Sequence, residues 1–153
     1  MSLIRTITPA DLDALKAVIE STGLFPPELL DNMTAAYFSA TPTDDVWLTY
    51  EENGTPVAVA YYAPERMTEG TYNLYLIAVH SDRQGKRIGA ALLIHIENTL
   101  REEGARILII ETSGLPEFES SRKFYDRCGY TREAVIREFY AEGDDKVVFW
   151  KKL

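Results

Sequence analysis

The sequence is poor in the residues that form cross-links, metal sites and membrane spans. Its single cysteine, Cys128, excludes an internal disulfide. The two histidines, His80 and His95, are distant from it in sequence, and no cluster has the spacing of metal ligands. No stretch approaches the roughly 20 apolar residues that a membrane-spanning helix needs, and the first residues lack the apolar run of a signal peptide. We therefore expect a cytoplasmic protein without a metal.

Positive charge is also scarce. The chain has 16 lysines and arginines against 24 aspartates and glutamates, which gives a formal net charge of −8. An acidic surface repels nucleic acid and anionic membranes, so we expect neither as a partner. The same charge favours a cationic substrate, such as an amine.

The 153 residues contain no repeat, low-complexity tract or linker, and we expect one domain over residues 1–153. Hydrophobic periodicity predicts an α+β fold, in which a mixed sheet of about seven strands is flanked by about four helices. The expected strands are Leu3–Ile7, Val46–Tyr50, Pro56–Ala63, Thr71–Val79, Arg106–Thr112, Tyr130–Tyr140 and Lys146–Lys151. The expected helices begin at Pro9 and Phe25 or cover Ile88–Glu103 and Glu119–Cys128.

Two strand pairings are indicated directly. Asn53-Gly54 lies between two apolar runs, which is the strongest local signal for a hairpin. The final hairpin turns at Glu142 to Asp145, and its last strand carries four consecutive large apolar residues, Val147, Val148, Phe149 and Trp150. This strand offers an apolar edge, so a homodimer is one expectation.

The most informative segment is His80 to Ala90. It places three basic residues within five positions (Arg83, Lys86 and Arg87) where a strand passes into a helix. Glycines let the backbone approach a ligand closely, and the first amides of a helix attract anions. The segment matches neither a P-loop nor a dinucleotide-binding fingerprint. The residues alone fit either a phosphate site or a solvated basic turn that caps the helix.

Gln84-Gly85-Lys86-Arg87-Ile88-Gly89-Ala90 resembles the acetyl-CoA signature of the GNAT superfamily of N-acetyltransferases, Q/R-x-x-G-x-G/A. Phe124 to Tyr130 resembles the later FYxxxGF element of that superfamily, and the order of elements is also similar. The chain departs from the pattern at Arg87, where the signature has its central glycine, at Phe118, where asparagine is frequent, and at Ser121, where alanine is usual.

The resemblance implies acetyl-CoA as cosubstrate and a direct attack of an amine on its thioester. The backbones of Ile77 and Val79, beside Ala78, would bind the pantetheine arm on a strand that separates from its neighbour. The amides from Gln84 to Ala90 would hold the pyrophosphate. The remaining expected cofactor contacts are Ser121 and Phe124.

Tyr125 matches the tyrosine that acts as the acid in such enzymes. Proton transfer from an ordinary tyrosine to a thiolate is uphill by roughly 2 kcal/mol, so a hydrogen bond to the developing thiolate is the safer expectation. For the base, many members carry a glutamate at the position of Asn73, which cannot accept the proton. Glu111 is the best remaining carboxylate. It acts either as a base through water or as a structural partner of the following loop, and solvent is a further alternative.

The sequence therefore predicts an N-acetyltransferase that moves acetyl from acetyl-CoA to a primary amine of a small molecule or peptide. Two alternatives stay open. One is an acyl-CoA-binding sensor with little or no turnover, which the absence of a carboxylate at Asn73 supports. The other is an unrelated phosphate-binding module.

Overall fold

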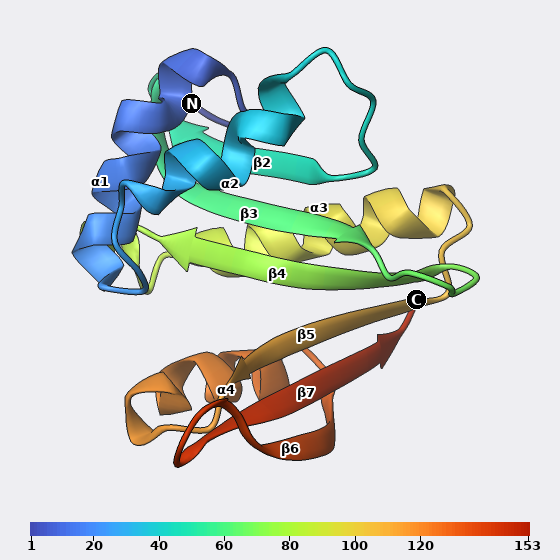
Figure 1. Cartoon of the computed structure of the whole chain (residues 1–153). Helices are drawn as coiled ribbons and strands as arrows, with labels where there is room; N and C mark the ends of the chain where they lie inside the picture. The colour runs from blue at the N-terminus through green and yellow to red at the C-terminus, as the bar shows by residue number, and fades with distance from the viewer. The chain divides into compact units, whose positions relative to one another are not determined.

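A computed structural model describes residues 1–153. It confirms the α+β prediction, with seven strands and four α-helices (Figure 1). The strands are β1 (Ser2–Thr6), β2 (Val46–Glu52), β3 (Thr55–Pro64), β4 (Thr71–Val79), β5 (Ile107–Ser113), β6 (Thr131–Ala141) and β7 (Asp144–Lys152). The helices are α1 (Leu12–Thr22), α2 (Leu29–Phe38), α3 (Ile88–Glu102) and α4 (Glu119–Arg127). The strands pair in the order β1-β2-β3-β4-β5-β7-β6, and β4 and β5 are parallel, as expected for strands joined by a helix.

The chain forms two compact units. The first contains Met1–Ala63 and Leu76–Asn98, and the second contains Pro64–Tyr75 and Thr99–Leu153. The boundary runs through β4, so the beginning of this strand belongs to the second unit and its end to the first. Each unit has its own set of candidate functional residues.

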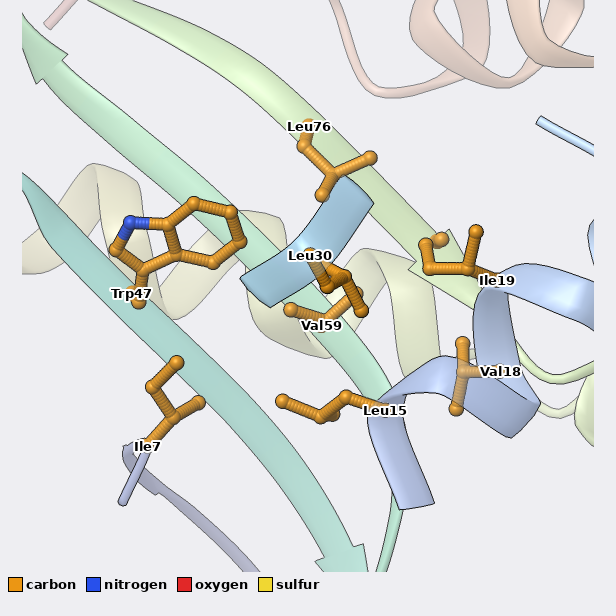
Figure 2. Packing of buried hydrophobic residues seen from close by; sticks show 9 residues of the cluster. Ile7, Leu15, Val18, Ile19, Leu30, Trp47, Val59 and Leu76 are labelled. Atoms are coloured by element: carbon orange, nitrogen blue, oxygen red, sulfur yellow. The ribbon is translucent and has the colours of Figure 1, made fainter. Parts of the chain in front are cut away.

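The first unit is built on an apolar cluster between α1, α2 and the strands (Figure 2). Leu15, Val18 and Ile19 share one face of α1, as their helical spacing predicts, and all three are fully buried. They meet residues of β2, β3 and β4, among them Trp47, whose ring stacks on Tyr61 with centroids 4.4 Å apart. Burying each large side chain contributes roughly 1.5–3 kcal/mol, which fixes α1 on the strands.

The start of α1 is held by a charged capping structure. The N–H of Thr8 donates to the carboxylate of Asp11 at 2.7 Å, and Arg5 donates to both oxygens of the same carboxylate at 2.8 and 2.9 Å. Pro9 opens a short 3-10 turn, and the α-helix itself begins at Leu12 rather than at Pro9. Thr8 and Asp11 thus form a capping box, one turn ahead of the α-helix.

The Asn53-Gly54 hairpin is confirmed. Both residues have positive φ, 50° and 83°, as a two-residue type I′ turn requires. The second helix begins at Leu29, later than the expected Phe25. The carbonyls of Pro26 and Pro27 accept turn hydrogen bonds from the N–H groups of Leu29 and Leu30, and the α-helix starts after this turn.

The predicted apolar edge at the end of the chain is wrong. β7 lies between β5 and β6 and is paired with both, so it is not an edge strand. Val147 and Phe149 are buried there, and the ring of Phe149 packs against Tyr125 of α4. The outer strand of the second unit is β6, and it exposes Val135, Ile136, Phe139 and Tyr140.

No helix is long and apolar enough to cross a membrane.

Candidate active site

The connection from β4 to α3 is anchored to the first unit at its beginning. The N–H of His80 donates to the carbonyl of Val57 at 2.9 Å, and the N–H of Ser81 donates to Oγ of Ser21 at 3.0 Å. A 3-10 turn over Ser81–Arg83 follows, and α3 then begins at Ile88. These bonds fix the start of the loop relative to β3 and α1.

The backbone N–H groups of the loop are free to donate hydrogen bonds to a ligand. Gly85 and Arg87 both have positive φ, 77° and 65°. The N–H groups from Gly85 to Ala90 donate to no group of the chain, and the first bond of α3 runs from the N–H of Ala91 to the carbonyl of Arg87. Six unpaired donors at the positive end of a 15-residue helix are suited to bind an anion.

Arg87 occupies the position of the signature's central glycine, and its conformation is the one that glycine favours. A side chain in the left-handed region costs roughly 1–2 kcal/mol relative to glycine. Arg87 thus combines a strained backbone with a guanidinium group at the loop. The sequence showed the departure, and the structure shows that the backbone has kept the glycine geometry.

The three cations of the loop have different surroundings. Arg83 forms an ion pair with Glu52, with Nε and Oε1 3.1 Å apart. Lys86 and Arg87 are exposed and form no ion pair within the chain, so they are available to a ligand. The side-chain amide of Gln84 donates to the carbonyl of Val79 at 3.1 Å and ties the loop to the end of β4.

The β4–β5 ladder is short. It covers Thr71–Leu74 and Ile107–Ile110, although both strands continue beyond it. Ala78 belongs to the core cluster of the first unit, whereas Ile77 and Val79 are half-buried.

In the second unit, α4 carries the predicted tyrosine. Tyr125 is buried, and its ring packs against Phe149 and Phe124, with centroids 5.2 and 5.4 Å away. Burial raises the pKa of Tyr125 above its ordinary value, and the nearby Cys128 thiol raises this pKa further. The hydroxyl has no hydrogen-bond partner within the chain. It is therefore a protonated donor with an unused hydrogen bond. Ser121 and Phe124 lie on the same helix, and both are half-buried.

Arg122 is a residue that sequence reasoning missed. It is buried, and its Nη1 donates to the carbonyls of Ser113 and Leu115 at 2.7 and 2.9 Å. These bonds hold the connection between β5 and α4, and thereby the start of the helix that carries Tyr125. A single arginine within a short helix carries no local signal for this role.

Glu111 has a cationic partner that the sequence did not indicate. Its Oε2 lies 2.8 Å from Nζ of Lys146 on β7, and the same ammonium lies 3.8 Å from the centre of the Phe139 ring. No group of three or more histidine, cysteine, aspartate or glutamate side chains is placed to hold a metal ion.

With this geometry in place, comparison with known proteins identifies the family. Residues 15–130 match the acetyltransferase (GNAT) family. The chain belongs to the GNAT acetyltransferase family. It is 25% identical to an uncharacterized N-acetyltransferase from Methanocaldococcus jannaschii, over 98% of this chain and 91% of the relative.

Solved structures agree with this assignment. A protein from Desulfovibrio desulfuricans assigned to the GNAT family is 33% identical, with a TM-score of 0.88 and 99% of both chains covered. The Salmonella typhimurium protein yncA, solved with acetyl-CoA, has the same fold, with 20% identity, a TM-score of 0.77 and coverage of 99% of this chain and 94% of that chain.

The predicted site residues of this GNAT chain thus fall into two groups. The signature residues from Gln84 to Ala90 form the end of the loop and the first turn of α3, in the first unit, which also contains Ile77, Ala78 and Val79. Glu111, Ser121, Phe124 and Tyr125 lie in the second unit.

Proposed function

We propose that the protein is an acetyl-CoA-dependent N-acetyltransferase that acts on a primary amine of a small molecule or peptide. The observation that carries this proposal is the row of unpaired N–H groups from Gly85 to Ala90, with Lys86 and Arg87 free beside it. A pyrophosphate offers the anionic oxygens that such a site requires. The bound acetyl-CoA in yncA supports the choice of cosubstrate.

In this proposal the cofactor contacts follow the signature. The amides of the loop hold the pyrophosphate, and the backbones of Ile77 and Val79 bind the pantetheine arm. Gln84 contributes by fixing the loop to Val79, because its side-chain amide is already used in that bond. Ser121 and Phe124 on α4 complete the predicted contacts. Residues 1–153 would act together as one catalytic domain.

The chemistry we propose is a direct attack by the neutral amine on the thioester carbon. The C–N bond forms, the C–S bond breaks, and the thiolate of coenzyme A leaves. Tyr125 donates a hydrogen bond to the developing thiolate, which its raised pKa favours because the phenol stays protonated. Glu111 accepts the proton of the amine through water. Its ion pair with Lys146 fixes the position of the carboxylate.

The net charge of −8 supports an amine as acceptor, since most amines are cations in neutral solution.

A homodimer stays a prediction. Because β7 is not an edge strand, the surface we propose for it is the exposed apolar side chains of β6. Light scattering over a range of protein concentrations tests it, and a monomer at every concentration would remove it.

An acyl-CoA sensor without turnover is the second candidate, because the carboxylate that many family members carry on this strand is replaced by Asn73. Two measurements separate the candidates. Calorimetry should show binding of coenzyme A, whereas binding of ATP without coenzyme A would favour an unrelated phosphate-binding module. A thiol-release assay with polyamines, aminoglycosides, amino acids and peptides should then show turnover above hydrolysis. Tight coenzyme A binding with no turnover on any amine would favour the sensor.

A further inference from the structure

Glu65 stands out among the carboxylates of the second unit. It follows β3, and its Oε1 accepts two hydrogen bonds, from Nδ2 of Asn73 and from the hydroxyl of Tyr75, both at 2.8 Å. The backbone around it is also fixed, since the N–H of Glu65 donates to the carbonyl of Thr71 at 2.8 Å. The carboxylate is therefore held in one position by two donors from β4.

Asn73 holds this carboxylate at a cost to its own bonding. The residue is 1% exposed, and its buried Oδ1 has no hydrogen-bond partner. A buried acceptor without a partner costs roughly 1–3 kcal/mol. Because a carboxylate only accepts hydrogen bonds, the amide nitrogen must face Glu65, and Oδ1 must point elsewhere. The orientation of Asn73 thus provides a hydrogen bond to Glu65 and leaves the acceptor of its own side chain unpaired.

Several carboxylates of the chain have a cationic partner, and Glu65 has none. Asp11 and Glu51 share Arg5, Glu111 pairs with Lys146, and Asp126 pairs with Arg132. Half-buried Glu65 forms no ion pair, and both of its partners are neutral. Two neutral donors position the charge without neutralising it, and they leave Oε2 open. Such a carboxylate is suited to bind a cation from outside the chain.

We propose that Glu65, held by Asn73 and Tyr75, binds a cationic amino group of the acceptor. This inference rests on the proposed acetyl transfer for the identity of the ligand. An ion pair with a carboxylate favours the charged form of an amine, whereas attack on a thioester requires the neutral form. The group at Glu65 is therefore a second amino group, distinct from the one that is acetylated. The preferred acceptors carry two amino groups, as a diamine does.

Binding is tested without turnover. In the full chain, n-butylammonium chloride should shift the side-chain amide NMR signal of Asn73 in a saturable way, because this amide donates to the carboxylate that binds the ammonium. Tetramethylammonium chloride, which has no N–H, should shift it at least tenfold less at equal concentration. Glu65→Gln should abolish the saturable shift, whereas Glu69→Gln, in the same loop and exposed, should retain it. No saturable shift in the wild type would overturn the proposal.

Specificity is tested with a series of 1,n-diaminoalkanes against monoamines of equal length. We expect kcat/KM for the best diamine to exceed that of its monoamine at least tenfold in the wild type and in Glu69→Gln. Glu65→Gln should bring this ratio close to one while the dissociation constant for coenzyme A stays unchanged. A wild-type ratio near one would refute the second-amine role. If no amine releases thiol while the Asn73 signal still saturates, the proposed acetyl transfer fails and the ammonium site stands.

Discussion

Lys146 places its Nζ atom 2.8 Å from Oε2 of Glu111, and only 10% of its side chain and 22% of that of Glu111 are exposed. This ion pair links β5 to β7 at the end of the ladder that joins them. It has two consequences that are measured separately. Removing either charge leaves the other, mostly buried ion without a partner, which destabilises the fold. Only the change at Glu111 also removes the proposed base.

Glu111→Gln should therefore lower kcat by about 100-fold, within the range for loss of a general base. It should also lower the free energy of unfolding by about 2 kcal/mol, because Lys146 loses a charged hydrogen-bond partner. Lys146→Met should lower stability similarly but lower the rate less than Glu111→Gln does, because the carboxylate remains and loses only the partner that positions it. The measurements are kcat well below the melting temperature and denaturant unfolding. Equal rate losses in both variants would assign Glu111 a structural role only.

Variants of Arg87 show whether the backbone amides or the guanidinium contributes more to coenzyme A binding. Arg87→Gly and Arg87→Ala remove the same guanidinium, but only glycine suits a φ of 65°. We expect the glycine variant to be about 1 kcal/mol more stable than the alanine variant. If the amides dominate, Arg87→Gly should weaken coenzyme A binding less than tenfold, and the loss should shrink as salt rises, because an exposed charge is screened.

The measurements for this pair are thermal melts and calorimetry at two salt concentrations. A loss of coenzyme A affinity well above tenfold in Arg87→Gly would show that the guanidinium holds the phosphates. Equal stability of the two variants would contradict the strain at position 87.

Local patterns predicted much of this molecule. The spacing of Leu15, Val18 and Ile19 gave the buried face of α1, and Asn53-Gly54 gave the hairpin, because both signals depend only on near neighbours. The position of β7 escaped prediction, since strand order is decided by pairing between distant segments. Glu65 escaped for the same reason: its role depends on a contact with Asn73 across a turn, and nothing in the sequence shows that the two side chains meet.

Tyr125 provides a prediction about pH. Since burial raises its pKa, its phenol remains protonated as the pH rises through 10, the ordinary value for tyrosine. Tyr125→Phe should lower kcat by about 100-fold, comparable to the loss of one oxyanion donor. The ratio of wild-type to variant kcat should stay constant from pH 7 to pH 10. The melting temperature should change little, because the hydroxyl has no partner within the chain. A ratio that falls above pH 9 would mean that the phenol ionises there.

Asp11 provides a prediction about acid stability. The hydrogen bonds from Arg5 lower the pKa of Asp11 below its ordinary value of 3.8, against the opposing effect of burial. The folded state therefore holds the carboxylate charged where the unfolded chain would begin to bind a proton. This contribution to stability is complete above pH 3.8 and is lost as the pH falls through the lower pKa of the folded state.

Asp11→Asn should accordingly lower the free energy of unfolding by about 2 kcal/mol at pH 7. Asp31→Asn is the matched control: it removes an equally short ion pair, with Lys16 at 2.8 Å, but its side chain is 54% exposed, so the loss should be below about 0.5 kcal/mol. Urea unfolding at pH 7, 5 and 3 measures both. The difference in free energy of unfolding between wild type and Asp11→Asn should be equal at pH 7 and 5. It should be smaller at pH 3, because acid begins to neutralise the carboxylate that the substitution removes. A gap independent of pH would mean that the shape of the capping box, rather than its charge, stabilises the start of α1.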